Sequence, residues 1–170
     1  MAVVVGALLI AAAAQISIPL GFTPVPITGQ TFAVLLVGAG LGPLAGATSV
    51  LLYVIAGGLG APVYASHAHG WSVISSASGG YLVGFIAAAA LTGALAQHRW
   101  DRQFPSSVAV MLTGNVVIYA FGITWLAHDL HLSTQKALEY GLYPFILGDL
   151  IKLYLAATAL PAAWRWARPR

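Results

Sequence analysis

The feature that most constrains this chain is its near absence of charge: 170 residues contain only seven Lys or Arg and four Asp or Glu. Charged residues make up 6% of the chain and hydrophobic residues 59%, whereas an ordinary soluble domain is about 25% charged. So few charges could not cover the surface of a soluble domain, and a disordered chain would be polar and charged. The nineteen glycines follow no three-residue period, which excludes collagen. The composition therefore predicts one domain that crosses a membrane several times.

The composition also excludes several kinds of function. The chain has no cysteine, which removes disulfides, thiolate metal sites and cysteine nucleophiles together. Its net charge of +3 comes from too few cations for a nucleic-acid surface. The sequence contains no defensible serine–histidine–aspartate arrangement, no phosphate-binding glycine loop and no paired carboxylates. We therefore expect neither an enzyme nor a cofactor, and the chain cannot power uphill transport with a nucleotide of its own.

Apolar stretches indicate six membrane-spanning helices, given that a helix needs about 20 mostly apolar residues to cross a bilayer. Gly42 and Pro43 predict a reversal between the second and third stretches, because proline cannot continue a helix and glycine commonly ends one. A signal peptide could mimic the first stretch, but a basic start is missing. The expected fold is an all-α integral membrane protein, one domain over residues 1–170, with spans at about 2–18, 31–41, 44–56, 79–97, 107–127 and 142–164.

Arginines predict the orientation, because Lys and Arg in short loops stay in the cytoplasm. Arg99 and Arg102 lie between the fourth and fifth stretches, and Arg165, Arg168 and Arg170 follow the sixth. With six spans these two groups fall on the same side of the membrane. Both termini are therefore expected to be cytoplasmic.

The longer loops then face outward, at residues 19–30, 57–78 and 128–141. They contain Pro-Val-Pro-Ile-Thr, Tyr64 and Trp71, which is the composition of ordered loops rather than of solvated linkers. Long loops commonly carry function. We expect a pocket or a lid on the outer side.

Asp149 and Lys152 are the clearest ionisable residues inside a span, where such residues are costly and mark functional sites. They are three residues apart and so share one face of a helix. Counted from Leu142 at about 1.5 Å per residue, Asp149 is expected about 10 Å below the outer end of the sixth span. Lys152 would meet a substrate anion, and Asp149 would accept hydrogen bonds from substrate N–H groups. The alternative is an internal ion pair that only joins helices.

Other polar residues in or near the spans have two possible roles. Asn115 is deep in the fifth stretch and could bond a neighbouring helix or contact a ligand. Gly79 and Gly80 open the fourth stretch, where backbone N–H groups can meet a polar ligand at close range. Tyr81 follows them and could equally belong to the aromatic belt of the membrane interface.

The start of the second stretch is polar as well. Thr28, Gln30 and Thr31 could point polar groups into the same cavity as Asp149. Gln15 lies near the outer end of the first stretch, where an interfacial position is the better reading. His67 and His69 form a pair in an outer loop, but two imidazoles without a third ligand do not predict a metal site.

Small residues line one side of the first stretch. Ala7 and Ala11 are four residues apart, a spacing that lets another helix approach closely. The pattern alone favours a helix of the same chain as the partner, with a partner subunit as the alternative.

These motifs together resemble the BioY family, the biotin-binding S-components of energy-coupling factor (ECF) transporters. Gly29 and the Ser-Ala-Ser run at 76–78 depart from the family pattern. The matching segments run in family order along nearly the whole chain: PVPIT at 24–28 with Gln30 and Thr31, LGP at 41–43, GATSVLLY at 46–53, GGLGAPVY at 57–64, GGYLVGF at 79–85 and GDLIK at 148–152.

The resemblance implies a multi-pass subunit of the bacterial cell membrane, surrounded by lipid, that binds biotin near its outer face. It further implies a transmembrane coupling subunit and two cytoplasmic ATPases as partners, with Ala7 and Ala11 docking on the coupling subunit. Lys152 would take the biotin carboxylate and Asp149 the ureido N–H groups, which Asn115 could also serve. The remaining pocket residues would be Thr28, Gln30, Gly79, Gly80 and Tyr81, together with Phe22, Val25, Tyr53 and Trp71.

Three alternatives stay open at this point. The nearest is an S-component for another vitamin, which would share the layout and differ in its pocket. An intramembrane enzyme would use Asp149 and Lys152 as acid and base. A structural bundle would bind no ligand.

Overall fold

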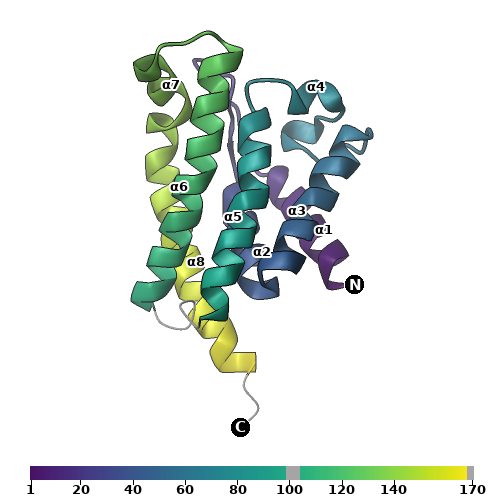
Figure 1. Ribbon diagram of the computed structural model, residues 1–170, viewed down its shortest axis with the longest axis vertical. Helices are drawn as coiled ribbons and strands as arrows, with labels where there is room; N and C mark the ends of the chain where they lie inside the picture. The colour runs from purple at the N-terminus through teal and green to yellow at the C-terminus, as the bar shows by residue number, and fades with distance from the viewer. Residues whose placement is uncertain (99–103, 168–170) are drawn as a thin grey trace.

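The computed structural model describes residues 1–98 and 104–167, and it is a bundle of helices with one short hairpin (Figure 1). The long helices are α1 (Ala2–Ala14), α2 (Gln30–Leu41), α3 (Pro43–Gly58), α5 (Gly79–Gln97), α6 (Phe104–Asp129) and α8 (Ile146–Ala167). The short elements are β1 (Ser17–Ile18), β2 (Ile27–Thr28), η1 (Ala65–His67), α4 (Trp71–Ile74), α7 (Thr134–Gly141) and η2 (Tyr143–Phe145).

The reversal between α2 and α3 follows from two adjacent residues. Gly42 ends α2 with a φ of +84°, a conformation that L side chains rarely adopt. Pro43 then opens α3, where its missing N–H and fixed φ suit the first turn of a helix. The structure thus forms the turn that this pair predicts.

Helix α5 is the centre of the bundle and packs against α2, α3 and α6 (Figure 1). At its end near the α2–α3 turn, the contact is so close that a Cβ on Gly93 would lie 2.4 Å from the carbonyl carbon of Gly42. A Cβ on Gly38 would lie 2.6 Å from the carbonyl oxygen of Ala89. Small residues thus let the backbones approach, which is how membrane helices associate.

The first predicted span, 2–18, is helical only as far as Ala14. Ser17 and Ile18 instead pair with Thr28 and Ile27 in a two-stranded antiparallel sheet, so the fold is not purely helical. The prolines at 19, 24 and 26 explain the difference, since a chain so rich in proline cannot continue a helix.

The predicted outer loops also contain structure. Residues 57–78 include η1 and α4, and residues 128–141 include the whole of α7. The sixth predicted span, 142–164, opens with the 3₁₀ turn at Tyr143–Phe145, and α8 starts only at Ile146. Asp149 therefore lies in the first turn of α8, about 4.5 Å along its axis, rather than about 10 Å from the helix end.

Two described helices, Gly79–Gln97 and Phe104–Asp129, are long and apolar enough to cross a membrane. The apolar helices Ala2–Ala14, Gln30–Leu41 and Pro43–Gly58 are shorter. Many large apolar side chains face away from the bundle, among them Val5 and Leu8 of α1 and Val116 of α6. Such faces suit contact with lipid.

Four of the arginines that predict the orientation lie outside the described residues: Arg99, Arg102, Arg168 and Arg170. The fifth, Arg165, belongs to α8. In the view of Figure 1, α1 runs upward from its first residue and α8 runs downward, while α4, α7 and the hairpin lie at the top.

Candidate functional site

A cavity of about 200 Å³ lies at the end of the bundle that carries the hairpin, α4 and α7. Segments far apart in the sequence form its wall, from β2 to the first turns of α8. Its lining is largely apolar with a few polar groups, the composition of small-molecule sites. The lining residues are Val25, Pro26, Thr28, Gln30, Thr31, Tyr64, Ala65, Ala68, Val73, Ser78, Tyr81, Leu82, Phe85, Ile118, Tyr119, Phe145, Asp149 and Lys152.

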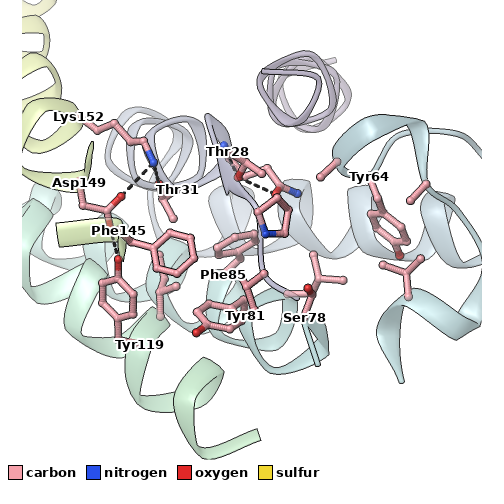
Figure 2. A pocket seen from close by; sticks show the side chains of 18 residues that line it. Thr28, Thr31, Tyr64, Ser78, Tyr81, Phe85, Tyr119, Phe145, Asp149 and Lys152 are labelled. Atoms are coloured by element: carbon pink, nitrogen blue, oxygen red, sulfur yellow. Dashed lines mark hydrogen bonds and ion pairs between the residues drawn. The ribbon is translucent and has the colours of Figure 1, made fainter. Parts of the chain in front are cut away.

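One side of the cavity carries a charged network built on α8 (Figure 2). Lys152 Nζ lies 3.0 Å from Asp149 Oδ1 and 3.3 Å from Thr31 Oγ1, to which it also donates. The Tyr119 hydroxyl donates to the other carboxylate oxygen, Oδ2. The first turn of a helix also favours a carboxylate, because the helix dipole is positive there. Asp149 is therefore held as a buried, oriented anion next to a cation.

A polar pair from β2 and α2 forms a second part of the wall. The Thr28 hydroxyl donates to Gln30 Oε1 over 2.9 Å, and Gln30 Nε2 donates to the hydroxyl of Tyr53. Tyr53 itself is 1% exposed on α3. The hairpin register sets Thr28 opposite Ser17, just before α2 begins at Gln30. The turn from strand to helix thus presents a hydroxyl and an amide to the cavity.

Aromatic side chains supply much of the apolar wall (Figure 2). Tyr81 and Phe85 come from successive turns of α5, Tyr119 from α6 and Phe145 from η2. The rings of Tyr81 and Tyr119 meet edge to face, with centroids 6.4 Å apart. The Tyr81 hydroxyl donates to the carbonyl of Gly141 over 2.8 Å, which leaves its ring as the surface that faces the cavity.

The structure brings together six of the residues singled out in the sequence, as all of them line this cavity: Thr28, Gln30, Thr31, Tyr81, Asp149 and Lys152. Val25 lines it too, and Tyr53 touches it through Gln30. Phe22 and Trp71 do not line it, and both are largely exposed.

Three predicted site residues lie outside the cavity wall. A Cβ on Gly79 would lie 1.8 Å from the carbonyl oxygen of Ile74, and one on Gly80 would lie 2.2 Å from the Cβ of Trp125. Both glycines thus serve the packing of α5. Asn115 is buried on α6, one helical turn from Tyr119, and its Oδ1 has no hydrogen-bond partner among the described residues.

The most important residues missed from sequence are Tyr119 and Phe145. Neither stands out in an apolar stretch, and no spacing rule connects Tyr119 to a carboxylate thirty residues later. The available signal for Tyr119 is its place one turn after Asn115 on a helix already suspected of facing a ligand.

The two alanines of α1 differ in burial. Ala7 is 8% exposed and packs in the core of the chain itself, while Ala11 is partly buried against that core. His67 and His69 lie near each other on the loop after α3, where His69 Nδ1 is 3.3 Å from the His67 carbonyl oxygen. Among the described residues, no three His, Cys, Asp or Glu side chains gather as metal ligands.

A sequence model described as the BioY family matches residues 1–169. The chain belongs to this family. Its similarity to individual members covers most of both chains. It is 42% identical over 149 residues to the biotin transporter BioY of Thermotoga maritima, which covers 88% of this chain and 85% of that protein. It is 40% identical over 147 residues to the biotin transporter BioY of Rhizobium etli, covering 82% of this chain and 78% of that one.

The fold matches a solved structure of the same kind. A crystal structure of the S-component for biotin from an ECF-type ABC transporter superposes with a TM-score of 0.86. The sequences are 26% identical, and the match covers 96% of this chain and 88% of the other. A similarity of this extent covers nearly the whole described bundle.

Proposed function

We propose that this chain is the biotin-binding S-component of an ECF-type vitamin uptake transporter, and not an enzyme. The observation that carries the proposal is the cavity itself, in which a buried Lys152–Asp149 pair and the Thr28–Gln30 pair stand among apolar walls. Membership of a family whose relatives are named biotin transporters supports biotin as the ligand.

The chemistry of biotin suits these groups. Its ureido ring offers two N–H donors and a carbonyl acceptor, its thioether ring is apolar, and its side chain ends in a carboxylate. Lys152 binds the carboxylate, and Asp149 accepts from the ureido N–H groups. Each carboxylate oxygen of Asp149 has a further lone pair besides the one it shares with Lys152 or Tyr119, so the network can admit a ligand without being dismantled.

The apolar part of biotin packs against the aromatic wall formed by Tyr81, Phe85, Tyr119 and Phe145. Thr28 and Gln30 hydrogen-bond the ligand's remaining polar atoms. Asn115, whose buried Oδ1 is unpaired among the described residues, offers a further acceptor for the ureido N–H groups. Gly79 contributes by letting α5 approach Ile74 of α4, and Gly80 by letting it approach Trp125 of α6, rather than by touching biotin.

In the membrane, α1, α2, α3, α5, α6 and α8 form six spans, with both termini in the cytoplasm and the cavity open toward the outside of a bacterial cell. The short α1, α2 and α3 do not reach the full bilayer thickness as helices, so the hairpin and the loop after α3 complete the wall at the cavity end. Because the chain has no cysteine, single cysteines can be introduced and labelled one at a time. A cysteine at Gly21 should react only with reagent added outside the cell, and one at Gly40 only with reagent on the cytoplasmic side. Labelling of both from the same side would contradict this topology.

A transmembrane coupling subunit and two cytoplasmic ATPases supply the energy for uptake. The coupling subunit docks along α1 beside Ala11, where the neighbouring Leu8 is exposed. Ala7 shapes this surface from beneath, since its own side chain packs inside the chain.

Calorimetry on the purified chain tests the assignment. We expect biotin to bind tightly, and thiamine and riboflavin not to bind. Asp149→Asn and Lys152→Ala, tested separately, should each weaken biotin binding. Unchanged affinity in both variants would refute the assignment of the site, and preference for another vitamin would refute the ligand.

A further inference from the structure

The loop after α3 forms part of the cavity wall in an unusual backbone conformation. Tyr64, Ala65 and Ala68 line the cavity. Between them, Ser66 and His67 have φ values of 57° and 60°. Two consecutive non-glycine residues in the left-handed region are uncommon and persist only where surrounding contacts hold them. The loop therefore needs a fastening.

The side chain of Gln15 provides that fastening. Its Oε1 accepts from the backbone N–H of His67 over 3.2 Å. Its Nε2 lies 3.3 Å from the Val63 carbonyl oxygen and 3.2 Å from that of Tyr64. One amide thus holds the loop just before the left-handed turn and at the second residue of that turn.

Gln15 is itself fixed to α1. It is the residue that ends this helix, and its Nε2 also donates to the Ala11 carbonyl over 3.0 Å. The strand β1 begins two residues later, and there Ser17 Oγ accepts from Ser66 Oγ over 3.3 Å. Side-chain hydrogen bonds therefore join the end of α1 and the start of β1 to this loop.

The side chain of Tyr64 gives the start of the loop a second anchor. The Tyr64 ring is buried against Tyr53 and the backbone of Gly57, and its hydroxyl donates to the Val54 carbonyl over 2.6 Å. Gly60 and Gly70 flank the segment with φ values of 107° and 91°. The segment from 65 to 69 thus lies between the fixed Tyr64 ring and Gly70, whose N–H donates to the Gly57 carbonyl over 2.7 Å, and it is the part expected to move when the Gln15 contacts break.

We propose that Gln15 is a latch, a positioning residue that fastens the loop after α3 over the cavity and so sets how fast a ligand enters and leaves. The ligand in this proposal is the biotin of the proposed function, on which the kinetic part of the inference rests. Breaking the latch raises the association and dissociation rates together, because it opens the path without altering the groups that bind.

Exchange of labelled for unlabelled biotin measures the dissociation rate directly. Radiolabelled biotin bound to the purified chain is chased with unlabelled biotin, and its association is followed separately. Gln15→Met keeps the length of the side chain and removes its polar atoms, so we expect both rates to rise about tenfold, the effect of losing one to two hydrogen bonds. Gln135→Met on the exposed α7 is the matched control and should leave both rates unchanged. Unchanged rates in Gln15→Met, or a loss of binding sites with normal rates in the remainder, would overturn the latch.

A reversible cross-link tests the converse. Ser17→Cys together with Ser66→Cys introduces the only cysteines in the chain, at positions whose side-chain oxygens are 3.3 Å apart. In the Gln15→Met background, oxidation should slow biotin release back to the original rate or below it, and reduction should restore fast release. Release that ignores the redox state of this pair contradicts the proposal.

Hydrogen exchange on the ligand-free chain separates failure of the latch from failure of the proposed function. In Gln15→Met the amides of residues 63–68 should exchange at least about tenfold faster, since the His67 N–H loses its acceptor. Faster exchange supports the latch even if the chain does not bind biotin, and unchanged exchange refutes it even if it does.

Discussion

Two ion pairs of the same design occupy very different places in this molecule. Lys136 and Glu139 on α7 are three residues apart with a nitrogen–oxygen distance of 3.0 Å, and so are Asp149 and Lys152 on α8. In the α7 pair the side chains are 54% and 35% exposed, whereas in the α8 pair Lys152 is 19% exposed and Asp149 8%.

The difference lies in what surrounds each pair. An exposed pair contributes little to stability, because water solvates the separated charges well. A buried pair must compensate for lost hydration, which it does with additional hydrogen bonds. Tyr119 and Thr31 provide these on α8. The three-residue spacing of two opposite charges therefore does not indicate a binding site by itself. Burial of the pair at a cavity, with hydrogen-bond partners for its charges, does indicate one.

The largest expected difference is between two variants that each remove one of the lysines. Lys152→Met leaves the Asp149 carboxylate buried without its cation and, in the proposed site, removes the cation that would bind the biotin carboxylate. We expect affinity for biotin to fall at least about 100-fold, in line with the cost of truncating a buried charge pair. Lys136→Met should change it by less than about twofold. Calorimetry on both variants makes the comparison, and equal losses would break the contrast.

Removing the carboxylates is the next test. Asp149→Asn preserves size and one acceptor while it removes the charge proposed to receive the ureido N–H groups, so affinity should fall about thirtyfold. Glu139→Gln should leave affinity unchanged, since its carboxylate is on the surface of α7. An unaffected Asp149→Asn variant would reduce the α8 pair to a structural contact.

Each pair also has a tyrosine beside it, which allows a finer comparison. Tyr119→Phe removes the hydroxyl that orients Asp149, and the loss of one such bond should weaken biotin binding about fivefold. Tyr140 lies under Lys136, with the nitrogen 5.3 Å from the ring centroid, and Tyr140→Phe keeps that ring. Equilibrium binding should show no change for Tyr140→Phe, and a similar change in both would argue against a special role for Tyr119.

The smallest effect concerns pH. The hydrogen bond from Lys136 holds the pKa of Glu139 below its ordinary value of 4.5, and the same contact raises the pKa of Lys136 above 10.5. A lowered carboxylate pKa means that the pair contributes stability above the unfolded value and loses it as pH falls through the folded one. A raised lysine pKa adds stability below 10.5 that is lost at higher pH.

The difference in thermal midpoint between the original chain and Lys136→Met should therefore be constant between about pH 5 and 10 and disappear at lower pH. Thermal unfolding by intrinsic fluorescence can follow it. A difference that instead changed near neutral pH would show that another group titrates at α7.

Much of this molecule could be predicted from sequence for physical reasons that are local. Long apolar stretches form helices in a membrane, and the Gly42–Pro43 pair forms a turn, because neither has another stable structure there. Asp149 and Lys152 stood out because charge is so rare in this chain. The resemblance of the sequence motifs to the BioY family is confirmed by the match of the family model to residues 1–169.

What could not be predicted depends on contacts between distant segments. Tyr119 approaches Asp149 only because α6 packs against α8. Gly79 and Gly80 pack closely against Ile74 and Trp125, and no local pattern connects either glycine to these neighbours. The position of Gln15 near the end of an apolar stretch predicts only an interfacial residue. Its contacts with a loop about fifty residues away follow from the packing of α1 beside α3.

The opposite charges of Asp149 and Lys152 on α8 determine how a membrane potential would act on the cavity. Asp149 and Lys152 cancel, and the other cavity-lining residues carry no charge, so an empty cavity is neutral at its centre. A monovalent carboxylate ligand would add one uncompensated negative charge. Carrying one charge across a membrane potential of 100 mV corresponds to about 2.3 kcal/mol. Inward movement of the loaded cavity would therefore run against an inside-negative voltage, and return of the empty one would be indifferent to it.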